Sequence, residues 1–190
     1  MTVAEVYKEI AAHMIKGMMI HEQLANYYDF LGLDGYKKCH EYHYLMETCS
    51  YRKVCQYYIN HHNKLIDYMD IENPHIIPNN WYGHSQSEVD VNTKRNAVKT
   101  GLHAWIDWET DTKKLYEQMY KELMNNDAIA SACMIRGLIE DVDHELCKAQ
   151  KYLINKEMVS YSIESILSEQ HDKKEKYEFT MKTELIQKIC

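Results

Sequence analysis

Three glutamates, Glu22, Glu47 and Glu109, fall at or beside the middle of stripes of apolar and aromatic residues that recur with helical spacing. The buried stripe of a helix recurs every three or four residues, so an ionised carboxylate on it must be paired with a cation or bound to a metal. These residues therefore indicate a polar site inside a bundle of helices, with the chemistry of paired or metal-bound carboxylates.

The spacing of the acidic residues about two predicted turns supports the same interpretation. Residues that are equidistant from the turn of an antiparallel helical hairpin lie at one level. Glu22 and Glu47 are equidistant from a turn that contains two glycines, and Glu109 and Asp143 are equidistant from an Asn-Asn-Asp turn. We therefore expect each hairpin to bring two carboxylates to one level, with all four in one layer if the two levels align.

Imidazole groups accompany these carboxylates. His43 precedes Glu47 by one helical turn on the same face, whereas Glu140 and His144 lie farther round the fourth helix from its apolar stripe. Ionised carboxylates in a dry core repel one another, and divalent cations remove that repulsion. Carboxylate and imidazole are suitable ligands for iron, manganese or zinc. The candidate metal ligands are Glu22, His43, Glu47, Glu109, Glu140, Asp143 and His144.

The elements that must position these residues are long helices. Only 6 Gly and 2 Pro interrupt the 190 residues, and the hydrophobic share of 45% is enough for a sizeable core. Short links force consecutive helices to lie antiparallel as hairpins. The apolar periodicity predicts four main helices, over residues 3–31, 36–68, 92–124 and 128–153.

The two predicted hairpins are joined by a long irregular stretch, residues 69–91, which holds both prolines. Such a length is unusual inside a compact domain and is sufficient to travel the full length of a bundle. We predict an all-α four-helix bundle over residues 1–153, including this crossover, and a C-terminal helical tail over residues 154–190. Asp127 is predicted to cap the fourth helix.

Composition and charge exclude several classes of protein. The formal net charge of −7 argues against a general affinity for nucleic-acid backbones or anionic membranes. No apolar run approaches the roughly 18 residues of a membrane helix, and we expect no signal peptide. The 6 cysteines form no CxxC motif and are expected to be reduced. We expect a cytoplasmic protein that forms a homodimer.

The arrangement resembles the ferritin-like superfamily of dimetal-carboxylate four-helix bundles. The shared features are two antiparallel helix pairs, a long crossover between the second and third helices, and inward-facing carboxylates. The stretch Gly-Leu-Asp-Gly-Tyr-Lys-Lys at residues 32–38, followed by a long polar and aromatic helix, is similar to the first turn and second helix of bacterial members. The resemblance implies iron or manganese as cofactor, with O₂ or peroxide activation, or iron oxidation, as activity.

The metal motif of that superfamily is degenerate in this chain. The resemblance implies one Glu on each of helices one and three, which Glu22 and Glu109 match, and a Glu-x-x-His motif on helices two and four. On helix two, Glu47 is followed at i+3 by Ser50, so His43 would have to supply the nitrogen.

On helix four the motif is also incomplete. Asp141-x-x-His144 has the spacing but an Asp in place of the Glu, and Glu140-x-x-Asp143 has the Glu but lacks the His. The resemblance implies that Asp143 is a bridging or terminal ligand and that His144 supplies a second nitrogen.

Other interpretations of the same residues stay open. Arg136 can pair with Glu109, and tyrosine hydroxyls with Glu47, which would make the acids structural. The chain would then be a metal-free helical interaction protein, of the phage or mobile-element type, on a degenerate ferritin-like scaffold. The His43-x-x-x-Glu47 spacing also matches helix two of hemerythrin-like bundles, but the His-x-x-x-His pair of that family is absent.

Overall fold

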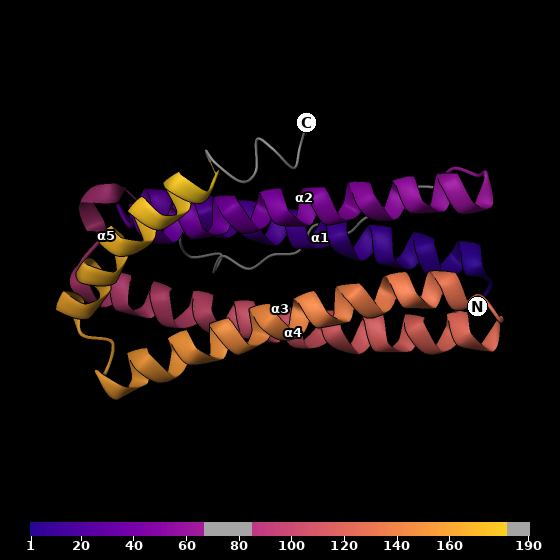
Figure 1. The fold of residues 1–190 in the computed structure, drawn as a ribbon. Helices are drawn as coiled ribbons and strands as arrows, with labels where there is room; N and C mark the ends of the chain where they lie inside the picture. The colour runs from indigo at the N-terminus through magenta and orange to yellow at the C-terminus, as the bar shows by residue number, and fades with distance from the viewer. Residues whose placement is uncertain (67–84, 182–190) are drawn as a thin grey trace.

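The fold is known from a computed structural model that describes residues 1–66 and 85–181. The described elements are α1 (Val3–Phe30), α2 (Asp34–His62), the short 3₁₀ helix η2 (Gln86–Glu88), α3 (Val91–Asn125), α4 (Ile129–Met158) and α5 (Ile163–Thr180). Helices α1 and α2 form one antiparallel hairpin, and α3 and α4 form a second (Figure 1). The predicted all-α four-helix bundle with a C-terminal helical extension is thereby confirmed.

Local interactions of polar side chains set the helix starts. The backbone N–H of Thr2 donates to Oε2 of Glu5 at 2.7 Å, and the Glu5 N–H donates to Oγ1 of Thr2 at 3.3 Å. This reciprocal capping box satisfies two N–H groups at the start of α1. Asp90 begins α3 in a similar way, since its Oδ1 accepts from the Thr93 N–H at 2.7 Å.

Three predicted boundaries differ from the structure. Helix α2 ends at His62 rather than at residue 68, because Asn63 takes the left-handed conformation with a φ of 51°. Asp127 is not the cap of α4: its φ is 54°, and Ala128 occupies the cap position without a side-chain hydrogen bond. Helix α4 continues to Met158, so the predicted start of the tail at residue 154 lies inside a helix.

The predicted crossover, residues 69–91, falls largely outside the described residues; its described part contains η2 and the start of α3. Within residues 1–66 and 85–181, no helix combines the length and apolar character needed to cross a membrane.

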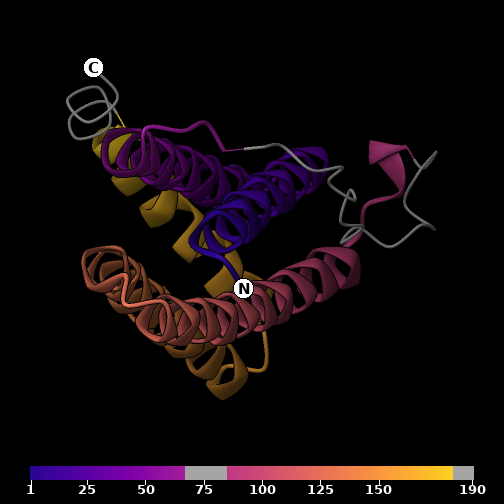
Figure 2. The same ribbon diagram turned by 90° about the vertical axis from the view of Figure 1, so that its right-hand side faces the viewer.

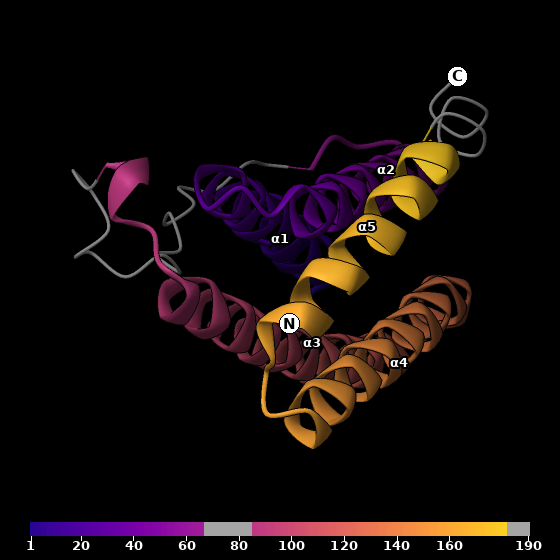
Figure 3. The same cartoon turned by 90° about the vertical axis from the view of Figure 1, so that its left-hand side faces the viewer.

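The two hairpins are splayed like a wedge. Helices α1 and α3 pack against each other, whereas α2 and α4 diverge (Figures 2 and 3). Helix α5 turns back from the end of α4 and crosses that end of the bundle to pack on α2 (Figure 3). The close approach requires Gly35 on α2, because a Cβ there would collide with the backbone of Gln170 on α5.

The apolar core is divided into two clusters at opposite ends of the bundle. One cluster includes Val6, Met119 and Ile135, and the other includes Leu24 and Leu102; each of these side chains is at most 4% exposed. The middle of all four bundle helices lies between the two clusters. That middle layer carries the polar residues of the candidate site.

Candidate metal centre

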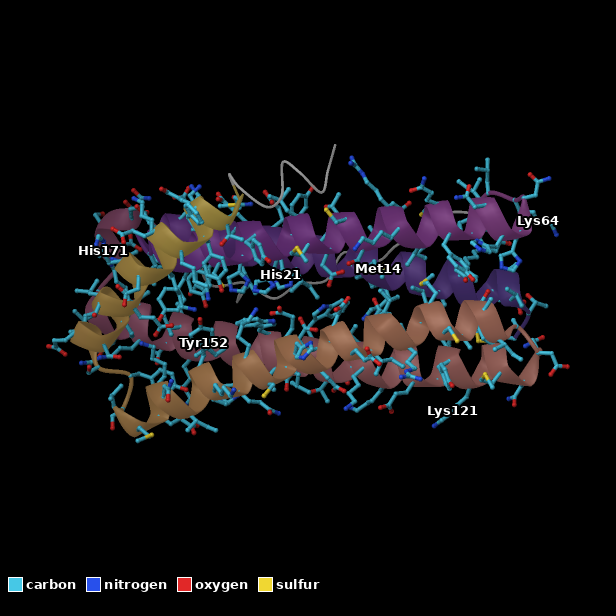
Figure 4. The ribbon with its side chains drawn as sticks, in the orientation of Figure 1. Met14, His21, Lys64, Lys121, Tyr152 and His171 are labelled. Atoms are coloured by element: carbon cyan, nitrogen blue, oxygen red, sulfur yellow. The ribbon has the colours of Figure 1, made fainter. Side chains whose placement is uncertain are left out.

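A cavity of about 360 Å³ lies in the middle layer and is lined by residues from all four bundle helices. Its polar wall includes His21 of α1, His43 and Glu47 of α2, Glu109 and Tyr116 of α3, and Glu145 of α4. Exposed side chains from α2 and α4 mark its mouth, namely Lys53, Asp141 and His144. Figure 4 labels Met14 and His21, which line the cavity from the side of α1 that faces the second hairpin.

Three carboxylates from three helices share this cavity. Glu109 is 4% exposed, and its Oε1 accepts a hydrogen bond from Nε1 of Trp105 at 3.1 Å. Burial, together with neighbouring Glu47, raises the pKa of Glu109 to about 8. Burial, together with Glu145, raises the pKa of Glu47 to about 7. The pKa of each of these two acids is therefore raised by the charge of another acid in the cavity, as is usual for carboxylates that occupy one site.

At the level of Glu47, helix α1 presents a glycine to the cavity rather than a carboxylate. A Cβ added to Gly17 would lie 3.1 Å from Oε1 of Glu47 and 3.1 Å from the ring of Trp108. The α1 residue that faces Glu47 is thus Gly17 and not Glu22, which lies about one and a half turns farther along α1. The register of the first hairpin differs from the predicted one, so the expected level pairing of Glu22 with Glu47 is wrong.

His21 takes the inward position that was predicted for its neighbour Glu22. Nδ1 of His21 lies 3.0 Å from Nδ1 of His40, and the His21 ring stacks on His43 with the ring centres 5.2 Å apart. Burial lowers the pKa of His21 to about 3, and burial with nearby histidines lowers the pKa of His40 and of His43 well below its usual value. These imidazoles are therefore neutral at pH 7, the form that ligates metals.

His43 and Glu145 present polar atoms that lack hydrogen-bond partners among the described residues. His43 is 4% exposed, and its Nε2 has no hydrogen-bond partner among the described residues. Oε2 of Glu145 likewise accepts no hydrogen bond from them. Nδ1 of His43 lies 3.7 Å from that oxygen, while Lys148 donates to the other oxygen, Oε1, at 2.7 Å. Buried polar atoms without partners are rare in proteins, so each of these two atoms is available to a ligand.

Two of the predicted ligands lie on the outer surface. Glu22 is exposed, and its Oε1 accepts from Nδ2 of Asn26 at 3.3 Å. Asp143 is exposed and pairs with Nζ of Lys113 at 2.7 Å. The structure therefore does not bring Glu22 and Asp143 to the cavity, contrary to the expected layer of four acids.

The predicted helix-four ligands are likewise exposed. Glu140 forms an ion pair with Nε of Arg136 at 3.2 Å, and both side chains are exposed. The alternative pairing of Arg136 with Glu109 is therefore wrong. His144 lines the mouth of the cavity and is exposed.

Glu145 is the carboxylate that sequence reasoning missed. It lies three residues after Val142 and four before Ala149, both of which are buried, so it belongs to the inward face of α4. That spacing is visible in the sequence. The predicted ligands Asp143 and His144 are exposed and lie on a different face of the helix.

The chemistry of the donor set fits a divalent cation, since it combines three carboxylates with a neutral imidazole. Over residues 1–66 and 85–181, no group of three or more His, Cys, Asp or Glu side chains is already arranged to hold a metal ion. Glu47 and Glu145 extend from α2 and α4, the helices that diverge, so a shared ion requires their side chains to approach each other.

Solved structures similar to this fold are archaeal ferritins. An engineered closed form of the Archaeoglobus fulgidus ferritin aligns with a TM-score of 0.75 at 12% identity, covering 90% of this chain and 94% of that chain. A humanized archaeal ferritin aligns with a TM-score of 0.76 at 13% identity over the same shares. No protein-family model and no curated protein sequence matches the chain.

At these identities the similarity concerns the fold. The similarity spans nine-tenths of the chain and agrees with the two antiparallel hairpins described above. The predicted resemblance is confirmed at this level: the chain has the ferritin-like four-helix fold, extended by one C-terminal helix.

Proposed function

We propose that the cavity binds a divalent metal ion, iron or manganese, through Glu47, Glu109 and Glu145, with His43 as the nitrogen ligand. The observation that carries the proposal is that three carboxylates from three helices line one cavity, beside a buried imidazole whose Nε2 has no partner among the described residues. The ferritin-like fold supports iron handling in general.

The chain's own residues hold and orient the ligands. Trp105 fixes one oxygen of Glu109, and Met14 and Val142 give the cavity wall apolar surface that limits access of water. When bound, iron or manganese would supply redox chemistry, either activation of O₂ or peroxide or oxidation of iron itself as a substrate.

Protons compete with the metal for the same carboxylates. Because the pKa values of Glu47 and Glu109 are about 7 and about 8, both acids are partly neutral at pH 7, and a metal ion must displace their protons. The affinity for metal is therefore expected to rise between about pH 6 and pH 8. Partial neutralisation of Glu47 and Glu109 also reduces charge repulsion in the cavity when no metal is bound.

Equilibrium dialysis of the full chain against Mn²⁺ at pH 8, followed by elemental analysis, tests the proposal. Each of the substitutions Glu47→Gln, Glu109→Gln and Glu145→Gln keeps the shape but removes a charge, and we expect each to weaken binding by about tenfold or more. Glu140→Gln, on the outer surface of α4, is the matched control and should bind as the wild type does. Wild-type affinity in all three cavity variants would refute the proposal.

The metal-free interaction protein is the alternative that the same experiment distinguishes. A wild-type chain that retains neither Mn²⁺ nor Fe²⁺ after loading would favour it. The predicted homodimer is a separate proposal, which light scattering of the metal-free and metal-loaded chain measures directly.

A further inference from the structure

A cationic side chain that lies next to the cavity pairs with one of the acids that line it. Nζ of Lys148 lies 2.7 Å from Oε1 of Glu145, and the Lys148 side chain is 35% exposed. Burial and Glu47 raise the pKa of Glu109, and Lys148 opposes that rise. The ammonium group therefore acts on acids contributed by two different helices, α3 and α4.

The charges of the cavity acids and of the adjacent Lys148 do not cancel. The three carboxylates carry three negative charges when ionised, and Lys148 carries one positive charge, which leaves two negative charges. At the mouth, Lys53 and Asp141 have opposite signs and exposed side chains, so they leave this balance unchanged. The remaining charge equals that of one divalent cation.

The number of available metal-binding groups also indicates a single ion. The oxygen of Glu145 that is free of Lys148, Oε2, lies beside His43, whose Nε2 is also without a partner among the described residues. Together with Glu47 and Glu109 this makes four ligand groups, since Nδ1 of His21 is already engaged with Nδ1 of His40. Four groups are enough for a single ion but few for two. A second divalent ion would add two positive charges to a cavity that a first ion had already neutralised.

We propose that Lys148 is the resident counter-ion of the cavity, and that the cavity therefore takes one divalent cation per chain rather than two. This inference rests on the proposed metal binding at the same site. Lys148 acts through Glu145 and through its charge, and it is not itself a ligand, because an ammonium group has no free electron pair.

Mn²⁺ titration of the full chain at pH 8 tests this, with stoichiometry from equilibrium dialysis and low-temperature electron paramagnetic resonance as the second readout. The wild type should bind one ion and give the six-line spectrum of an isolated Mn²⁺. Lys148→Gln should still bind one ion, about tenfold or more tightly, because a competing positive charge is gone. Lys148→Glu, which adds a fourth carboxylate, should bind two ions with the spectrum of a coupled pair.

Lys151→Gln is the matched control, since Lys151 is exposed on the same helix about one turn away. It should bind as the wild type does, and circular dichroism establishes that each variant is folded; the Lys148→Gln comparison carries the test if Lys148→Glu does not fold. Two ions in the wild type, no tighter binding by Lys148→Gln than by Lys151→Gln, or a single ion in folded Lys148→Glu would each overturn the inference while leaving metal binding intact. A wild type that binds no Mn²⁺ would remove both proposals.

Discussion

Charged side chains are buried in two regions of the molecule, and the excess charge has the opposite sign in the two regions. Beneath α5, Glu169 forms ion pairs with both Lys156 and Lys173, whose side chains are 3% and 4% exposed. Nζ of Lys173 also lies 3.7 Å from the centre of the Tyr152 ring, and Nζ of Lys156 donates to the carbonyl oxygen of Ser165 at 3.1 Å. This network joins α5 to the end of α4.

The cavity between α2 and α4 has the opposite character. Its carboxylates, Glu47, Glu109 and Glu145, outnumber the ammonium group of Lys148 that pairs with Glu145, and burial raises the pKa of Glu47 and of Glu109. Each buried lysine beneath α5 has a carboxylate partner, whereas the cavity acids meet mainly one another. We infer that the network beneath α5 stabilises the fold and that the cavity is kept for binding.

The largest expected effect is on the network beneath α5. The substitution Glu169→Gln would leave Lys156 and Lys173 buried without their common partner, and it should lower the free energy of unfolding by about 3–5 kcal/mol. Urea denaturation measures this. Asp111→Asn, which breaks the exposed pair with Lys114, is the control and should cost less than about 1 kcal/mol. A loss from Glu169→Gln as small as that of the control would contradict the comparison.

The next effect is the pH dependence of the metal-free protein. A raised carboxyl pKa means that the native state binds more protons than the unfolded state, so stability falls as pH rises through the raised pKa. The buried histidines act with the opposite sign, but below their unfolded pKa near 6.5. From pH 7 to pH 8 the effect of Glu47 and Glu109 exceeds that of the histidines, and the free energy of unfolding should fall by about 1 kcal/mol.

The double substitution Glu47→Gln with Glu109→Gln should remove most of that fall. Denaturant titrations in a chelator, at several pH values from 6 to 8, compare the two proteins. If the free energy of unfolding changed with pH by the same amount in both proteins, the cavity acids would not be the source of the pH dependence.

A substitution in the cavity wall should change the affinity for metal more than the stability of the fold. The substitution Gly17→Ala places a methyl group against the Glu47 carboxylate and the Trp108 ring. Better helix propensity, worth up to about 1 kcal/mol, offsets part of the crowding, so stability should change little. Mn²⁺ affinity should nevertheless fall by about tenfold, because a displaced ligand binds poorly. Unchanged affinity would mean that the position of Glu47 does not matter for binding.

The smallest effects are expected for the predicted ligands that lie on the surface. Glu22→Gln and Asp143→Asn remove exposed carboxylates whose neighbours are Asn26 and Lys113. Each should change the free energy of unfolding by less than about 0.5 kcal/mol and leave Mn²⁺ binding at its wild-type value. A marked loss of metal from either variant would show that the cavity extends farther than the described geometry indicates.

Much of the fold is predictable from the sequence because helix formation and hairpin pairing are local. The apolar periodicity predicts α1 and α3 to within a residue or two, and the short turns fix their antiparallel partners. Glu109 is also correctly predicted to face inward, since one stripe of residues on α3 determines its direction. The end of α2 is not predictable in this way, because it depends on the left-handed backbone of Asn63.

The sequence alone determined the helices, their pairing and the presence of acids on their inner faces, because periodicity within one helix records which side is buried. Only the tertiary structure decided which of those acids meet. The register that sets Gly17 against Glu47, the splay of α2 from α4, and the entry of Glu145 and His21 into the cavity all depend on packing between helices. A shift of one residue turns a side chain by about 100° around its helix, so a small difference in register exchanges an inward residue for an outward one.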